Sequence, residues 1–117
     1  MHPVIRRGFS FAVSLLILFV IPFMSTSVLA GNPHVAEAVS HAEEAVGQGE
    51  GGSAEGLVMH AQVSLKHAYA AAKEVTSPHL DAGIRELEDA IAHGKKGHAE
   101  IATKHAKSAV MHMQEIQ

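Results

Sequence analysis

Apolar residues recur every three or four positions in four segments of the chain, which is the period of an α-helix. When each segment is written in heptads, these residues take the a and d positions, which face the core of a helical bundle. No segment alternates polar and apolar residues between hairpin turns, so no β-strand is expected. The predicted core positions are Val35, Ala38, Ala42, Ala45, Ala61, Ser64, Ala68, Leu80, Gly83, Leu87, Ala90, Ala99, Ala102, Ala106, Ala109 and Met113.

Local signals mark the ends of the four helices. Asparagine and serine are good N-terminal caps, proline fits the first turn, and glycine commonly ends a helix. Short connections favour antiparallel neighbours, so the expected fold is all-α: an up-down-up-down antiparallel four-helix bundle formed by residues 31–117. The predicted helices run from Asn32 to the glycine-rich stretch 47–52, from Ser53 to about Val75, from Ser77 to 94–97, and from His98 to near the C-terminus.

Residues 1–30 have the pattern of a secretory signal peptide. Arg6 and Arg7 precede the apolar run Phe9–Phe23, and small residues lead up to Ala30, after which we expect cleavage. The alternative is an uncleaved membrane anchor, but the run contains Pro22 and is shorter than the roughly 20 residues of a membrane span. Export by the general secretory or the twin-arginine route stays open. Either route places the mature chain in the periplasm, without stable membrane association.

Composition excludes several kinds of site. The chain has no cysteine, which rules out disulfides, thiolate metal sites and covalent haem attachment. Removal of Arg6 and Arg7 leaves seven Lys and Arg residues against twelve Asp and Glu residues, a formal charge of −5. A negative surface attracts cations and disfavours nucleic acid.

Histidines follow the apolar stripes at steps of seven residues. Such a step is nearly two helical turns, so the imidazoles of one helix share one face, at the g position beside the core. Histidine fills nine of the twelve g positions, and Gln48, Ser53 and Glu86 fill the rest. We therefore interpret these histidines as metal ligands. They are His34, His41, His60, His67, His79, His93, His98, His105 and His112.

The sequence also repeats itself. A displacement of 45 residues aligns His34–His67 with His79–His112 without a gap. This pattern indicates a tandem duplication of a helical hairpin, with copies at about 33–75 and 78–116. The identical pairs are His34/His79, Glu43/Glu88, Ala45/Ala90, Gly49/Gly94, Gly52/Gly97, Ala54/Ala99, Glu55/Glu100, His60/His105, Ala61/Ala106 and His67/His112.

Helix geometry predicts which histidines can share an ion. Two residues seven apart on one helix are separated by about 10.5 Å of rise, whereas metal–nitrogen bonds are about 2 Å. The ligands must therefore come from across a hairpin, or from a carboxylate one turn away. The predicted cross-hairpin pairs are His34/His67, His41/His60, His79/His112, His93/His98 and the mixed pair Glu86/His105.

Carboxylates stand at the right spacing to complete such sites. Glu37, Glu44, Asp89 and Glu115 each lie three or four residues from a histidine, and Glu86 occupies a g position itself. Imidazole with carboxylate suits Cu(II), which we favour, and also Ni(II), Zn(II) and Co(II).

Two alternatives fit some of the same residues. A stripe of imidazoles could respond to pH, and a His/His or Met/His pair could bind haem without covalent attachment. A di-iron carboxylate bundle is excluded because Glu-x-x-His does not occur in the chain. No arrangement of nucleophile, base and orienting group stands out, so we do not expect an enzyme.

Three segments carry a resemblance to a known family. HVAEAVSHAEEAV at 34–46, ELEDAIAHGKKGH at 86–98 and IATKHAKSAVMH at 101–112 resemble the small histidine-rich metal-binding proteins of the bacterial periplasm. The resemblance covers essentially the whole mature chain. It implies a monomeric four-helix bundle that binds several divalent metals, copper prominently, and buffers or scavenges them. Family members tend to carry histidine at more heptad positions, so Gln48, Ser53 and Glu86 predict fewer sites here.

Overall fold

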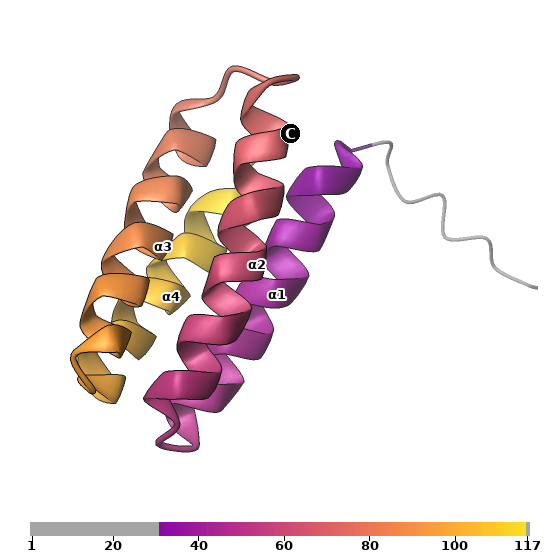
Figure 1. Ribbon diagram of the computed structural model, residues 1–117. Helices are drawn as coiled ribbons and strands as arrows, with labels where there is room; N and C mark the ends of the chain where they lie inside the picture. Colours follow the sequence, from indigo (N-terminus) through magenta and orange to yellow (C-terminus); the bar gives the residue numbers. More distant parts are fainter. Residues whose placement is uncertain (1–30, 117) are drawn as a thin grey trace, which may run out of the picture.

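The computed structural model describes residues 31–116, and the predicted signal peptide lies outside them. Within this part the chain forms four α-helices and no strand, as Figure 1 shows. None of these helices is long and apolar enough to cross a membrane. The helices are α1 (Pro33–Glu50), α2 (Ala54–Ala72), α3 (Pro78–Lys95) and α4 (Ala99–Gln114).

The predicted N-terminal caps are present. The Asn32 side chain accepts hydrogen bonds from the N–H groups of His34 and Val35. Ser53 and Ser77 accept corresponding bonds at the starts of α2 and α3. Each bond satisfies a backbone donor that the helix leaves without a partner.

The helix boundaries lie close to the prediction. The first helix ends at Glu50, within the predicted stretch 47–52, while α2 stops at Ala72, short of Val75. The fourth helix begins at Ala99, with His98 as its cap residue, and the His98 side chain makes no capping hydrogen bond. Glycine weakens a helix only modestly, so packing decides whether the helix continues.

Two connections share one conformation. Gly52 and Gly97 have φ angles of 84° and 78°, in the left-handed region that favours glycine. The N–H of Ser53 donates to the Gln48 carbonyl at 2.9 Å, and the N–H of His98 donates to the His93 carbonyl at 3.0 Å. Together with a second bond in each loop, this is the Schellman motif that commonly ends a helix. The motif brings residue 98 back beside residue 93.

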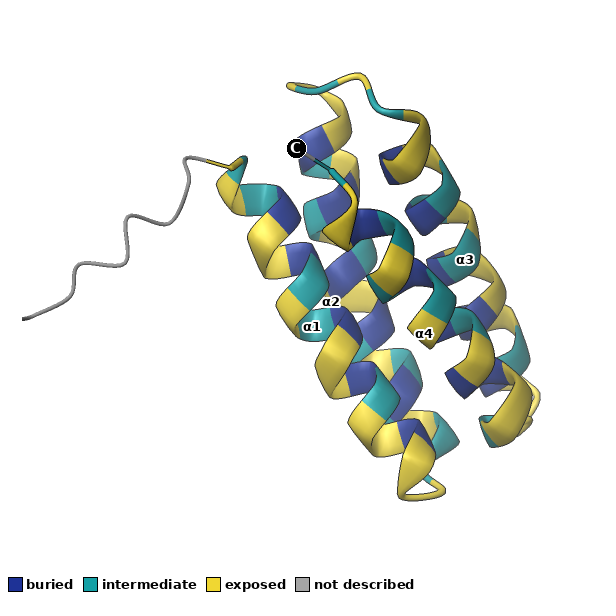
Figure 2. Ribbon diagram, turned by 180° about the vertical axis from the view of Figure 1, so that it is seen from behind, coloured by how far each residue is buried: buried dark blue, intermediate teal, exposed yellow. Residues whose placement is uncertain are grey.

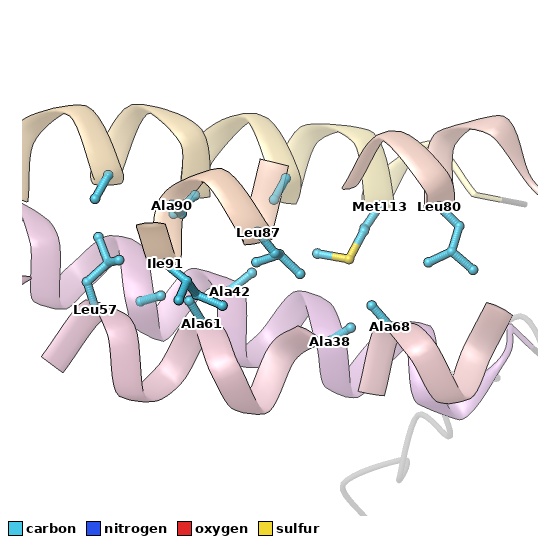
Figure 3. Packing of buried hydrophobic residues seen from close by; sticks show 14 of the residues in the cluster. Ala38, Ala42, Leu57, Ala61, Ala68, Leu80, Leu87, Ala90, Ile91 and Met113 are labelled. Atoms are coloured by element: carbon cyan, nitrogen blue, oxygen red, sulfur yellow. The ribbon is translucent and has the colours of Figure 1, made fainter. Parts of the chain in front are cut away.

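The core contains the predicted a and d positions and also Leu57, Ala71 and Ile91, which were not among them. All of these positions are buried except Ala99, which is half-buried. The buried residues form one stripe on each helix, seen in Figure 2. Most are alanine, and Figure 3 shows them around a few larger side chains. The Ser64 hydroxyl is buried but donates to the Ala38 carbonyl at 2.6 Å, so its polar group has a partner. The large, fully buried apolar side chains are Leu57, Leu80, Leu87 and Met113.

Glycines let the helices approach closely around the larger side chains. A Cβ added at Gly49 would lie 2.7 Å from Leu57, and one at Gly83 would lie 2.7 Å from Met113. A Cβ at Gly94 would lie 2.5 Å from Val58. Gly49 is a buried residue of α1, and its lack of a side chain leaves room for Leu57 of α2 and Thr103 of α4.

Replacing either loop glycine by alanine should destabilise the protein. An L-residue in the left-handed region costs about 1–2 kcal/mol, so Gly52→Ala and Gly97→Ala should lose similar free energies of unfolding. No atom lies within 4 Å of an added Cβ at either position, so the cost should come from backbone conformation alone. Urea denaturation measures both. If either variant is as stable as the parent, its loop does not depend on the left-handed conformation.

Candidate metal centre

The histidines lie beside the core rather than within it. Seven of the nine are half-buried, and His79 and His98 are exposed. This position follows from their place next to the buried a residue in each heptad. The imidazoles thus have one side against the bundle and one side accessible to an ion.

The structure brings every predicted histidine pair together. The ring centroids are 5.8 Å apart in His34/His67 and 6.3 Å apart in His41/His60. In the second hairpin, both His79/His112 and His93/His98 have centroids 6.0 Å apart. The mixed pair also meets, with His105 Nδ1 2.8 Å from Glu86 Oε2.

The structure adds two diagonal contacts that the sequence analysis did not predict. His41 stacks on His67 with centroids 5.7 Å apart, and His93 stacks on His105 at 5.2 Å. These distances are shorter than those of the direct pairs that the same histidines make. Helical side chains lean toward the N-terminus of their own helix, so residues one heptad out of step across a hairpin lean toward each other. This lean could have been used to find the contacts.

The direct and diagonal contacts join histidines into a zigzag. In the hairpin of α1 and α2 the order is His34, His67, His41 and His60, which we call the first ladder. In the hairpin of α3 and α4 the zigzag is divided. His105, His93 and His98 form one part, and the pair His79/His112 forms the other.

Carboxylates flank the first ladder on both sides of His41. Glu37 Oε2 lies 4.0 Å from His41 Nε2, and Glu44 Oε2 lies 3.3 Å from His41 Nδ1. Glu44 also reaches across the hairpin to His60 Nδ1, at 2.7 Å. Two groups result whose ligand atoms all lie within 4.8 Å of one another: Glu37, His41 and His67, and His41, Glu44 and His60.

In the second hairpin carboxylates contact histidines singly. Glu86 is held against His105, and Glu115 Oε2 lies 3.8 Å from His79 Nε2. Asp89 was expected one turn from His93, but it is exposed and makes no ion pair with a histidine among the described residues. The repeat aligns Asp89 with Glu44, and the Asp89 side chain is shorter by one methylene. The Nδ1 atom of His105 is instead in contact with Glu86.

Among residues 31–116, two buried imidazole nitrogens have no hydrogen-bond partner. His41 Nδ1 and His93 Nδ1 are both buried atoms within partly exposed side chains. The 3.3 Å approach of Glu44 to His41 Nδ1 does not have hydrogen-bond geometry. Buried polar atoms in folded proteins almost always have partners. A bound cation would provide one.

The donor set fits a borderline transition-metal ion. Imidazole nitrogen with carboxylate oxygen suits Cu(II), Ni(II), Zn(II) or Co(II). Two ligands on opposite sides of an ion with bonds of about 2.0–2.1 Å are about 4 Å apart. The groups around His41, within 4.8 Å, therefore need only small side-chain movements to close on an ion.

Comparison with known proteins agrees with this chemistry. The sequence matches the family described as small metal-binding protein over residues 10–116. The chain belongs to this family. Metal ions are thus the class of ligand that it binds. Among curated proteins, none gives a significant match. For this small metal-binding protein, the family description does not specify the metal, so the choice of ion is inferred from the ligands.

Replacing Glu86 by histidine should add metal-binding capacity. The substitution would fill the gap between His112 and His105 and make the second zigzag continuous. Glu86→His should therefore bind more Cu(II) than the parent chain. Equilibrium dialysis with metal analysis measures the ratio of metal to protein.

Glu88→His is the matched control. It makes the same exchange two residues away, at an exposed position of α3 whose carboxylate accepts a hydrogen bond from Tyr69. This control should leave the capacity unchanged. An equal gain in both variants would mean that any added surface histidine binds copper and that the zigzag has no special role.

Proposed function

We propose that the protein reversibly binds several divalent transition-metal ions, with Cu(II) favoured and Ni(II), Zn(II) and Co(II) as further ions. The histidine pairs across each hairpin would supply the ligands, and Glu37, Glu44, Glu86 and Glu115 would assist. The observation that carries the proposal is the pairing itself: four histidine pairs from different helices have ring centroids 5.8–6.3 Å apart. Asp89 has no observed contact that favours it as a ligand.

The proposed architecture is a pair of antiparallel hairpins derived by duplication. The histidine pairing supports the antiparallel order, because the residue numbers of each pair add to the same value within a hairpin. The start of α1 also lies beside the end of α2, where Asn32 donates a hydrogen bond to Glu74. Equivalent loop geometry at Gly52 and Gly97 supports the duplication.

The proposed setting is the periplasm, after removal of residues 1–30. There the protein would act as a monomeric buffer for metal ions, binding and releasing them without catalysis. The negative charge of the mature chain supports attraction of cations and disfavours nucleic acid as a partner. Free Cu(II) is reactive, so a protein that keeps it bound would be protective. Several sites on one small protein would suit such a buffering role.

Metal binding should raise the thermal stability of the protein. An ion held by two helices binds the folded state more tightly than the unfolded chain, whose histidines are not held in pairs. At an ion concentration of 100 times the dissociation constant, each independent site should add up to about 2.7 kcal/mol, less what the unfolded chain binds. Calorimetry of the mature chain should record a higher melting temperature with Cu(II) and its reversal by a chelator.

Two measurements complete this test. Metal analysis should find several equivalents of Cu(II) bound per chain, and haem added instead should produce no shifted Soret band. If copper binds and the melting temperature does not change, the ions do not bridge helices. If the protein binds none of the four metals and shifts the Soret band of added haem, the proposal is wrong and haem binding takes its place.

Metal uptake should weaken in acid. Imidazole binds an ion only in its neutral form, so protons compete with the metal as the solution is acidified from about pH 7.5 to about pH 5. Uptake of Cu(II), measured by dialysis at a fixed free concentration, should fall strongly over this range. Equal uptake at both pH values would assign the sites to carboxylates.

A further inference from the structure

Two candidate metal groups meet at His41 in the first ladder. One contains Glu37 and His67 with His41, and the other contains Glu44 and His60 with His41. The two groups that could hold a metal have His41 in common and share no other residue. If both groups hold a metal ion, the His41 imidazole must be a ligand of both ions.

The carboxylates of the two groups approach different nitrogens of the His41 ring. Glu37 lies on the Nε2 side and Glu44 on the Nδ1 side. An imidazole carries its two nitrogens on separate edges, and each can bind one metal ion. His67 stacks almost parallel to His41, with an angle of 5° between the rings, and His60 lies at 23°.

Besides the grouping of ligands, the state of the His41 Nδ1 atom also points to a bound ion. It is buried and has no hydrogen-bond partner, although the side chain as a whole is 27% exposed. Glu44 Oε2 lies 3.3 Å from this nitrogen without hydrogen-bond geometry, and 2.7 Å from His60 Nδ1. An ion between His41, Glu44 and His60 would contact all three groups.

We propose that His41 bridges a dinuclear metal centre, in which one ion binds Nε2 with Glu37 and His67 and a second binds Nδ1 with Glu44 and His60. This inference rests on the proposed metal-binding function and adds to it that two sites share one ligand. A neutral imidazole has one lone pair and one N–H. Bridging therefore releases the N–H proton to solvent and forms two metal–nitrogen bonds, with no change in oxidation state.

The second hairpin lacks this arrangement. Glu86 occupies the position that the repeat aligns with His41, and Ala82 occupies the position aligned with Glu37. The Glu86 carboxylate is already directed to one partner, His105 Nδ1. The two hairpins should thus differ: a bridged pair of ions in the first, and separate ions in the second.

Electron paramagnetic resonance tests the bridge directly. Two Cu(II) ions joined through an imidazolate couple antiferromagnetically, so the pair loses its signal at low temperature. In the mature protein saturated with Cu(II), the integrated signal should be smaller than the bound copper measured by metal analysis. In His41→Ala, total bound copper should fall, and the remaining copper should be fully visible.

Matched variants separate the bridge from general loss of ligands. His60→Ala and His67→Ala each remove one side of the centre, so each should leave an uncoupled, visible ion on the other side. His79→Ala removes a ligand from the second hairpin and should lower total copper while the invisible portion remains. Far-ultraviolet circular dichroism of each variant checks that the helices are intact.

The outcomes distinguish this inference from the proposed function. Several bound Cu(II) ions that are all visible in the parent protein would overturn the bridge and leave metal binding intact. Occupation of only one of the two groups at saturation, with the same full visibility, would mean that they compete for His41. Absence of any copper binding would instead refute the proposed function.

Discussion

Close approach of the helices is the constraint on which the rest of the structure depends. Alanine, glycine and serine fill most a and d positions, and they allow backbones to lie nearer than large side chains would permit. Where a larger residue such as Leu57 is buried, Gly49 yields the necessary space. The spacing of the helices in turn sets the distance between their g positions, which lie beside the core. Imidazoles at the g positions of the two helices of a hairpin therefore meet, and in the first hairpin the buried hydrogen bond from Ser64 to Ala38 also joins the two helices.

This dependence explains how much could be predicted from the sequence. The heptad pattern identified the buried face and every cross-hairpin histidine pair, because both follow from helix periodicity and short connections. The diagonal stacking of His41 on His67 depends on the lean of helical side chains, a general rule that the pairing argument left out. Glu44 contacts two histidines, whereas Asp89, which the repeat aligns with it, contacts none among the described residues; its side chain is shorter by one methylene, a difference that periodicity does not register. The glycine-rich stretch 47–52 contains the end of α1 at Glu50, as predicted, but the burial of Gly49 beside Leu57 and Thr103 depends on neighbouring helices that a local glycine signal does not specify.

The two hairpins have similar backbones and different side-chain chemistry. Each has a loop with a left-handed glycine, but only the second loop carries a histidine pair, at His93 and His98. Conversely, only the first hairpin has a histidine at the position of His41, and there carboxylates gather on both sides. Identical scaffolds thus hold ligand sets of different charge and donor number. Such a set would bind ions with a range of affinities, which lets a buffer act over a wider range of concentrations than a row of equal sites.

We expect stability and metal binding to be linked in this protein, because its core is small. A domain of this size buries limited apolar surface, and most of what it buries is alanine. Unpartnered imidazole nitrogens beside that core, such as His93 Nδ1, cost free energy in the absence of an ion. An ion shared between two helices removes that cost and adds its own binding free energy to folding. Release of metal, in acid or to a stronger ligand, would then return the hairpins toward a looser state. Exchange of ions with solvent would therefore require no opening of the bundle, since the histidines at the g positions are already partly exposed.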